Sequence, residues 1–388
     1  MKKILLITSF FIFILNSYSQ NLTLSNTAEI SFITVAPGKN LFDTWGHSAI
    51  RVHDYKSRLD RVYNYGMFDF NAPNFYTNFM KGQLLYSLAA YPFSYFLKGY
   101  SNENREVTEQ IINLTASEKQ NYFNFLENNA KPKNKNYYYD FFDDNCSTKL
   151  RDVTSIILKD KVNYHDELLE GNYTHRQLIY QKLDNHPWSK FGIDIALSSI
   201  IDKKTTSKQF TFLPSYAFEN FSNAQLTNNK PLIKQTKTLY KQRQDIVKKS
   251  FFTPMVVFTL LALFILFITY KDFKNNTRNK LLDFSILFST GIVGLVIVFL
   301  WFFTDHKTTA NNYNVFWAFL PNLIVAFYAF KNKSFLKTYY LILLGLLVIG
   351  IIFWVLKIQI YNWAMIPVLI FMGVRYYYNF YYLKKIVV

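Results

Sequence analysis

The chain of 388 residues contains only one cysteine, Cys146. A disulfide bridge needs two cysteines, so a fold held together by disulfides is excluded. The sequence also lacks zinc-type Cys and His spacing, a Gly-rich phosphate loop and a dinucleotide fingerprint, and we therefore expect no metal and no cofactor. Half of the residues are hydrophobic, which excludes a disordered chain, because such chains are poor in hydrophobic residues.

Acidic residues are scarce relative to basic ones: 26 Asp and Glu stand against 43 Lys and Arg, for a net charge of +17. A charge of this size is compatible with a nucleic-acid partner. Much of it, however, lies in loops that flank long hydrophobic segments. A lipid surface explains such cations more simply, so we expect a membrane partner and no nucleic acid.

Between the extreme N-terminus and about residue 250 there is no long hydrophobic run. The first residues combine two lysines, an apolar stretch over residues 4–15, and the small residues Ser17 and Ser19. This pattern predicts a secretory signal peptide over residues 1–19, with an uncleaved signal anchor as the alternative. In both cases the following domain crosses the membrane.

The C-terminal part, residues 251–388, has the long runs that the rest lacks. We predict five membrane spans, near residues 251–270, 281–303, 315–330, 338–356 and 360–383. The third is short and contains Pro321. Basic residues concentrate in the loops near residues 271–280 and 331–337 and at the C-terminus, so the positive-inside rule places these in the cytoplasm and residues 20–250 outside.

Residues 20–229 are expected to form an α+β domain. Alternating or β-branched apolar stretches predict strands over residues 30–36, 49–53, 61–65 and 106–114, of which the second and third form a hairpin. Thr115 and Glu118 form a capping box that opens one helix, and a second helix starts near Cys146. Residues 230–250 are predicted to be a basic linker, and the four lysines at 230, 234, 237 and 241 would share one face of a helix.

Cys146 is the candidate nucleophile. The partial positive charge of a helix N-terminus favours the thiolate, although a buried structural cysteine is the alternative. The neighbouring Asn145 is a residue type that can stabilise an oxyanion. A nucleophilic thiol also needs a base, and His47, at the start of a predicted strand, is the candidate.

Three short motifs occur in the order His47-Ser48-Ala49-Ile50, Tyr63-Asn64-Tyr65-Gly66 and Asn145-Cys146. They resemble the circularly permuted branch of the NlpC-type, papain-like thiol enzymes, in which the His precedes the Cys. Together with residues 173–179 and 191–194 and the multi-span C-terminal part, they resemble the bacterial lipoprotein N-acyltransferase family of the Lnb type.

This resemblance implies a permuted papain-like (NlpC-like) catalytic domain in the periplasm, followed by an all-α transmembrane bundle in the inner membrane. Cys146 and His47 would then be catalytic, and Asn64 or Asp69 would be the third member. The implied reaction moves a fatty acyl chain from a phospholipid, through a thioester on the cysteine, to the N-terminal amine of a diacylglyceryl-cysteine lipoprotein. The donor phospholipid, the diacylated lipoprotein and the membrane would be the partners.

Two alternatives remain open from the residues alone. The same Cys and His pair can serve a membrane-anchored thiol hydrolase, acting as a phospholipase or as a peptidoglycan amidase or peptidase. A catalytically inactive membrane receptor or scaffold is the other alternative.

Overall fold

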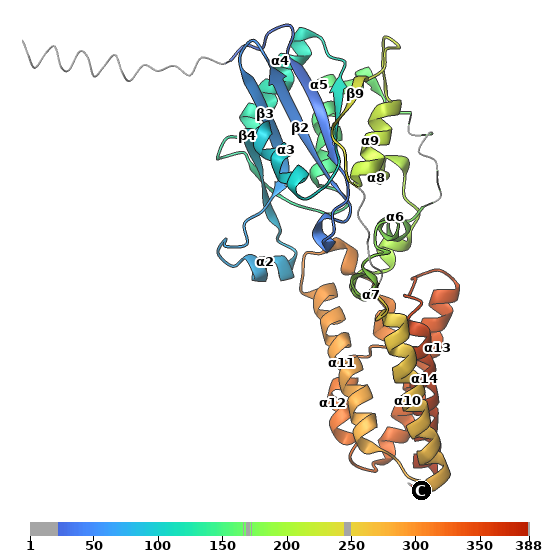
Figure 1. The fold of residues 1–388 in the computed structure, drawn as a ribbon. Helices are drawn as coiled ribbons and strands as arrows, with labels where there is room; N and C mark the ends of the chain where they lie inside the picture. The colour runs from blue at the N-terminus through green and yellow to red at the C-terminus, as the bar shows by residue number, and fades with distance from the viewer. Residues whose placement is uncertain (1–21, 166, 168–170, 172, 244–249, 387–388) are drawn as a thin grey trace, which may run out of the picture.

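The computed structural model describes residues 22–165, 167, 171, 173–243 and 250–386. Its N-terminal part is a mixed α/β domain, and its C-terminal part is an elongated helical bundle (Figure 1). The predicted signal peptide over residues 1–19 and residues 244–249 of the predicted linker lie outside the described residues.

A seven-stranded antiparallel sheet, in the order β6-β4-β3-β2-β1-β5-β9, is the centre of the α/β domain. The strands are β1 Glu29–Val35, β2 His47–Asp54, β3 Leu59–Met67, β4 Leu85–Pro92, β5 Val107–Ile112, β6 Asn136–Tyr138 and β9 Ile233–Tyr240. The strands predicted over 30–36, 49–53, 61–65 and 106–114 are thereby confirmed, as is the β2–β3 hairpin. A short second sheet pairs β7 Val162–Asn163 with β8 Gln225–Leu226.

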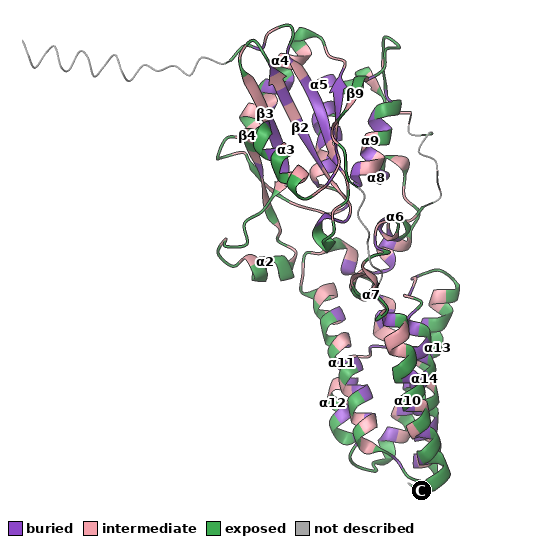
Figure 2. Cartoon of the chain, in the orientation of Figure 1, coloured by how far each residue is buried: buried purple, intermediate pink, exposed green. Residues whose placement is uncertain are grey.

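The central strands are buried on both faces, because helices cover each side of the sheet (Figure 2). In β1, Phe32 packs with the helices α4, α5 and α9, whereas its neighbour Ile33 packs with α3 on the other face. Successive side chains of a strand point to opposite faces, so a strand covered on both sides buries apolar side chains on each of them. The helices of this domain are α2 Phe75–Lys81, α3 Phe93–Asn102, α4 Ala116–Asn129, α5 Cys146–Leu158, α6 His175–Tyr180, α7 Pro187–Ala196, α8 Ser207–Phe210 and α9 Pro214–Asn223.

Local sequence signals set the starts of two helices. The Thr115 hydroxyl accepts a hydrogen bond from the Glu118 amide, and Glu118 bonds back to Thr115, so the predicted capping box opens α4. The predicted helix from Cys146 is also confirmed: Leu150 and Val153 of α5 are buried against the sheet. These caps satisfy amides that a helix terminus otherwise leaves without partners.

The segment predicted to be a basic linker contributes a strand. β9 pairs with β5 at the edge of the sheet, so the predicted helical face of lysines was wrong and the domain extends at least to Tyr240 rather than stopping at residue 229. The physical reason is that the backbone of β5 needs a partner on this side, and β9 contains the β-favouring residues Ile233, Thr236 and Thr238. Lysines suit an edge strand, since they discourage further pairing.

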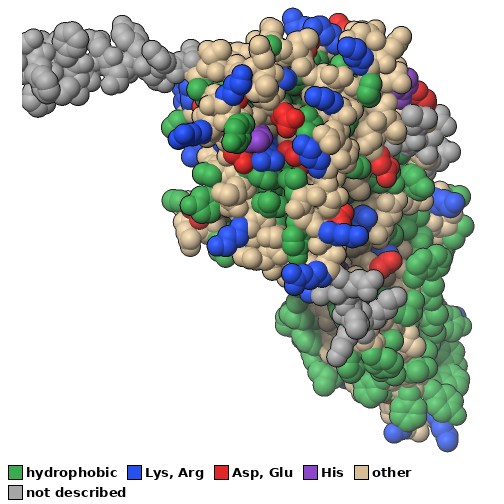
Figure 3. Space-filling model, turned by 45° about the horizontal axis from the view of Figure 1, so that its top comes forward, with side chains coloured by type: hydrophobic (Ala, Val, Ile, Leu, Met, Phe, Trp, Pro, Cys, Tyr) green, Lys and Arg blue, Asp and Glu red, His purple; other side chains and the backbone are tan. Residues whose placement is uncertain are grey.

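The helical bundle contains three helices that are long and apolar enough to cross a membrane: α10 Pro254–Asn275, α11 Lys280–Phe302 and α13 Ser334–Val355. A fourth long helix, α14 Met365–Ile386, packs against α10 and α13 and carries the buried polar residues Arg375 and Asn379. Hydrophobic side chains cover most of the bundle surface in view in Figure 3, and Lys and Arg side chains gather at its far tip.

The third predicted span, residues 315–330, is not a continuous helix. It is broken into the short pieces η6 Tyr313–Phe316, α12 Asn322–Val325 and η7 Ala326–Tyr328, because Pro321 lacks an amide proton and disfavours helix in the residue before it. The segment packs closely on α11 at Gly291 and Gly294; a Cβ added to Gly294 would lie 2.3 Å from the carbonyl oxygen of Ala318. The described part of the bundle therefore has four long helices and a broken fifth segment.

A buried polar cluster ties the helices together at the end of the bundle away from the α/β domain. Arg375 of α14 forms ion pairs of 2.7 Å with Asp272 of α10 and with Asp283 of α11. Arg278 adds a second ion pair of 2.8 Å to Asp283, and Asn379 donates a hydrogen bond to the same carboxylate. Charged groups at such depth persist when they are mutually paired.

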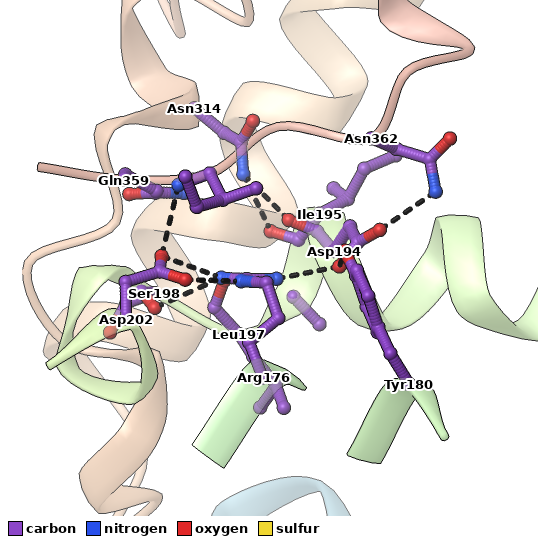
Figure 4. Close-up of polar contacts among 12 residues, drawn as sticks. Arg176, Tyr180, Asp194, Ile195, Leu197, Ser198, Asp202, Asn314, Gln359 and Asn362 are labelled. Atoms are coloured by element: carbon purple, nitrogen blue, oxygen red, sulfur yellow. Dashed lines mark hydrogen bonds and ion pairs between the residues drawn. The ribbon is translucent and has the colours of Figure 1, made fainter. Parts of the chain in front are cut away.

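A second buried polar cluster joins the α/β domain to the bundle (Figure 4). Arg176 of α6 forms ion pairs of 2.6 Å with Asp194 of α7 and with Asp202. The Asn362 side chain, from the bundle, donates a hydrogen bond of 2.7 Å to Asp194, and the side chain of Asn314 donates one to the Asp194 carbonyl. Because these contacts are buried and directional, they fix how the domain sits on the bundle.

Candidate active site

Cys146 is the first residue of helix α5, and Asn145 is the cap of that helix. The Asn145 side-chain oxygen accepts hydrogen bonds from the amides of Ser147 at 2.8 Å and Thr148 at 3.0 Å, and the Thr148 hydroxyl accepts one from the Asn145 amide. The Asn145 side-chain nitrogen donates to the carbonyls of Phe141 and Phe212, both at 2.8 Å. These bonds hold the start of the helix that carries Cys146, so Asn145 positions Cys146, and its predicted role at an oxyanion stays a prediction.

His47 is the first residue of strand β2, at the end of the sheet that faces the start of α5. It follows Gly46, whose φ of +88° is a conformation that L side chains rarely adopt, and a Cβ there would lie 2.7 Å from the Val35 carbonyl oxygen. Next to His47, the hydroxyls of Ser48 and Ser147 are buried and 2.8 Å apart, which joins β2 directly to the first turn of α5.

The thiol of Cys146 and the imidazole of His47 lie close enough that the charge of each shifts the pKa of the other. Burial by itself raises the pKa of the thiol, but the charge of His47, its hydrogen bond, and the backbone amides of Ser48 and Ser147 outweigh burial and lower that pKa. Burial lowers the pKa of His47, yet the thiolate and the hydrogen bonds of Cys146 and Asn64 raise it overall. Both shifts favour a thiolate–imidazolium pair.

Asn64 of strand β3 is the third member of the arrangement. Its side-chain oxygen is 2.6 Å from Nε2 of His47, while its nitrogen donates to the Tyr91 hydroxyl at 3.0 Å and to the sulfur of Met67 at 3.2 Å. With the amide oriented in this way, Nε2 of His47 is the donor to Asn64, which leaves Nδ1 for the thiol. Asn64 is buried, so this bond holds the ring in a fixed orientation.

The other predicted candidate, Asp69, lies in the exposed segment after β3. Its carboxylate accepts a hydrogen bond of 2.8 Å from the Asn71 amide and so stabilises a local turn. Between the two residues, β3 has an irregularity at Gly66, whose φ is +92°. A Cβ at Gly66 would lie 3.8 Å from Cβ of Cys146, so this glycine lies directly beside the cysteine.

Tyrosines line the surroundings of the thiol. Burial raises the pKa of Tyr137 and Tyr139, and the negative charge on Cys146 raises both further. The His47 ring lies 6.0 Å from the ring of Tyr100. The sequence did not indicate Tyr91, which orients Asn64, or these tyrosines, because only the pairing of β4 with β3 and β6 and the packing of α3 on the sheet bring them near the cysteine. Within the described residues, no group of three His, Cys, Asp or Glu side chains could hold a metal ion.

The site lies at the end of the domain that meets the bundle. The loop immediately before Asn145 contributes Asp140 and Asp143, which lie 3.7 and 3.8 Å from the Lys307 ammonium in the loop after α11. Residues 173–179 and 191–194, quoted above for their resemblance, belong to the Arg176 cluster that anchors the domain on the bundle. Their pattern in the sequence gave no sign of this anchoring role.

These observations define a multi-pass membrane protein whose α/β domain holds a paired cysteine and histidine next to its bundle. A comparison with protein-family models matches residues 16–181 to the Lnb N-terminal periplasmic domain and residues 246–386 to the Lnb transmembrane domain. The chain therefore belongs to the Lnb-type lipoprotein N-acyltransferase family, and its N-terminal domain is periplasmic. Neither the curated proteins nor the solved structures that were compared gave a match.

Proposed function

We propose that this protein is a cysteine-dependent lipoprotein N-acyltransferase. The observation that carries the proposal is the Cys146–His47–Asn64 arrangement at the membrane-facing end of the periplasmic domain. Family membership supports an acyl-transfer role, and the lowered thiol pKa supports Cys146 as the nucleophile. The substrates are a phospholipid as donor and a lipoprotein bearing a diacylglyceryl-cysteine as acceptor.

In the first half-reaction, the Cys146 thiolate attacks the ester carbonyl carbon of the phospholipid. The backbone amide of Cys146, at the first position of α5, is available to the resulting oxyanion, whereas the Asn145 side chain occupies the next two amides. The carbon–oxygen ester bond then breaks, and the His47 imidazolium gives its proton to the departing alkoxide. A lysophospholipid leaves, and a thioester on Cys146 remains beside a neutral His47.

In the second half-reaction, the lipoprotein amine attacks the thioester carbonyl. Neutral His47 accepts the proton that the amine loses as the amide bond forms. The carbon–sulfur bond breaks and regenerates the thiolate–imidazolium pair. Asn64 keeps His47 in one orientation through both steps, because its oxygen accepts a hydrogen bond from Nε2 of the ring.

An apolar groove in the bundle supports a lipid substrate. The groove has a volume of about 330 Å³ and lies between α10, α11 and α14, with Phe191 of α7 at the end near the periplasmic domain. Its walls include Phe258, Val293 and Met365 and are almost entirely apolar. Volumes of this size are typical of small-molecule sites, and the lining suits a hydrocarbon chain.

The proposed location is the inner membrane, with the C-terminus in the cytoplasm. Basic residues follow α10 and precede α13, and Lys384 and Lys385 end α14 at the tip of the bundle farthest from the periplasmic domain. The positive-inside rule places this tip in the cytoplasm.

The decisive experiment compares the native protein with Cys146→Ala in a lipoprotein acylation assay read by mass spectrometry. The variant should accumulate in the membrane and form no N-acylated lipoprotein; acylation at the native rate would refute the proposal. The second measurement is lysophospholipid release with and without a diacylated lipopeptide. Transfer requires continued release, beyond the single lysophospholipid freed when Cys146 is acylated, to depend on the lipopeptide, and equal continued release without it would identify a phospholipase instead.

A further inference from the structure

Helix α2 and its flanking residues carry a cluster of exposed apolar side chains. We name it the α2 aromatic surface, and it consists of the exposed Phe68, Phe70, Tyr76, Phe79 and Met80 and the partly exposed Phe75. The exposed fractions of Tyr76, Phe70 and Met80 are 69%, 58% and 54%. No residue of α2 is buried, and Figure 2 draws most of the helix in the colour of exposed residues. A contiguous apolar patch of this kind marks a site of interaction with a protein or a membrane.

The rings of this surface pack on one another rather than on the domain core. The centre of the Phe68 ring lies 4.7 Å from that of Phe70 and 5.9 Å from that of Phe75, and the Phe75 and Phe79 rings are 6.2 Å apart. None of the four belongs to the buried clusters that hold the sheet and its helices together. Their arrangement therefore contributes little to folding of the domain and leaves the outer faces of the rings available.

The contacts of α2 place this surface next to the end of a candidate membrane-spanning helix. The Asp305 amide donates a hydrogen bond of 2.7 Å to the Lys81 carbonyl, and the Gln83 side chain donates one of 3.1 Å to the Asp305 carboxylate. Gly82 ends α2 with a φ of +79°, and a Cβ there would lie 2.8 Å from the His306 amide nitrogen. These contacts hold α2 against the loop that follows α11, which is a candidate membrane span ending at Phe302 (Figure 1).

The surface is also continuous with the active site. Gly66 adjoins Cys146, and the sulfur of Met67 accepts a hydrogen bond from Asn64. The ring centre of the next residue, Phe68, lies 5.1 Å from that of Tyr86, and the Tyr86 ring stacks on the Tyr139 ring at 4.4 Å. Burial raises the pKa of Tyr139, and the negative charge of Cys146 raises it further. A chain of contacting aromatic side chains therefore links α2 to the surroundings of the thiol.

We propose that the α2 aromatic surface inserts into the outer leaflet of the membrane and binds the acyl region of a phospholipid there, beside Cys146. Aromatic side chains are stable at this depth of a bilayer, and an amphipathic helix lies in the interface plane. Exposed Lys81, in the last turn of α2, supplies positive charge for a phosphate group in the same region. The role of the bound lipid as acyl donor rests on the function proposed above; the membrane contact does not.

Because Cys146 is the only cysteine, Cys146→Ala gives a cysteine-free chain in which a single fluorescent label can be placed. Labels at Phe79→Cys and Tyr76→Cys would report on the surface, and one at Tyr55→Cys is the matched control, an aromatic position 85% exposed just beyond the end of β2 opposite His47. The full chain is placed in nanodiscs of phosphatidylethanolamine and phosphatidylglycerol, with and without spin-labelled lipid.

Spin-labelled lipid should quench the Phe79 and Tyr76 labels several-fold more strongly than the Tyr55 label. Equal, weak quenching at all three positions would overturn the proposal. A second outcome would also overturn the proposal: the Phe79 and Tyr76 labels are shielded from a water-soluble quencher in detergent but do not respond to spin-labelled lipid. In that case a second copy of the chain would cover the surface.

A second readout separates this inference from the proposed reaction. In the chain with Cys146 intact, the double change Tyr76→Ser and Phe79→Ser should reduce acyl transfer from bilayer phospholipid about tenfold, since about 1.4 kcal/mol of apolar contact is lost. Tyr55→Ser should retain the native rate. If Cys146→Ala still acylated lipoproteins, the proposed function would fail while the quenching result stood; native rates in the double variant would refute the donor-binding role.

Discussion

The Asn64 side chain offers the sharpest test of the site, because it touches His47 and is not itself a reactive group. Asn64→Ala removes the oxygen that lies 2.6 Å from Nε2 of His47, so that ring nitrogen loses this partner. A hydrogen bond to a charged group contributes about 1.5–3 kcal/mol. Since this bond raises the pKa of His47, its loss destabilises the imidazolium and, through the pair, the Cys146 thiolate.

The expected effect follows from that energy. The rate of acyl transfer should fall about ten- to a hundredfold, and alkylation of Cys146 by iodoacetamide should shift to higher pH, because the thiolate alone reacts. The direction of this shift follows from the pKa of Cys146. That pKa is lowered in the native protein, so the thiol reacts at a pH where an ordinary thiol is protonated. Weakening the thiolate–imidazolium pair raises the thiol pKa again, so alkylation then needs a higher pH. A merely structural role for Asn64 would leave this pH profile in place.

Two further variants complete the Asn64 experiment. Asn64→Asp keeps an oxygen that can accept the hydrogen bond and should restore much of the alkylation rate at neutral pH. Tyr91→Phe removes only the acceptor on the far side of the amide and should have a smaller effect. If Asn64→Ala alkylated at the native rate across the pH range, the inference that Asn64 orients His47 would be wrong.

Three other predictions concern the framework. Arg176→Met removes the ion pairs of the buried Asp194 and Asp202, so we expect the protein to lose about 3–5 kcal/mol of stability, with a lower Tm. Acyl transfer should weaken while Cys146 alkylates at the native rate. Slowed alkylation would contradict an anchoring role. Arg375→Met removes both ion pairs from α14 and should lower the Tm by a comparable amount, measured in detergent; an unchanged Tm would show that the cluster is not stabilising. Gly294→Val forces side-chain atoms against backbone and should cost about 1–3 kcal/mol or more, whereas Gly345→Val, where no atom lies within 4 Å, should fold normally.

Several elements could be predicted from the sequence because their signals are local. The apolar stretch around Phe32 and Ile33 indicated a strand, and the Thr115 capping box and the stripe containing Leu150 indicated helices; all three are present. The stretches near α10, α11 and α13 were recognised from length and hydrophobicity alone. Here the signal is the chain's own periodicity, which does not depend on distant partners.

Other elements could not be predicted because distant residues decide them. The lysine spacing of β9 fits a helix, but the unpaired edge of β5 made it a strand. The segment around Pro321 has the composition of a span, yet the proline and the close approach of Gly294 broke it into short helices. Asn64 and Asp69 were equal candidates in the sequence, and only the path of β3 placed one against His47 and the other in an exposed turn.

The sequence alone determined that the chain pairs an α/β domain with a hydrophobic helical part, and that Cys146 opens a helix, since composition, caps and periodicity are carried by neighbouring residues. Only the tertiary structure decided that Ser48 and Ser147, 99 residues apart in the chain, join β2 to α5 and so place His47 beside the thiol of Cys146. It also decided that Asn64 orients His47 and that Arg176 anchors the domain. The reason is that hydrogen bonds and ion pairs between distant residues depend on strand register and helix packing, which a linear pattern does not contain.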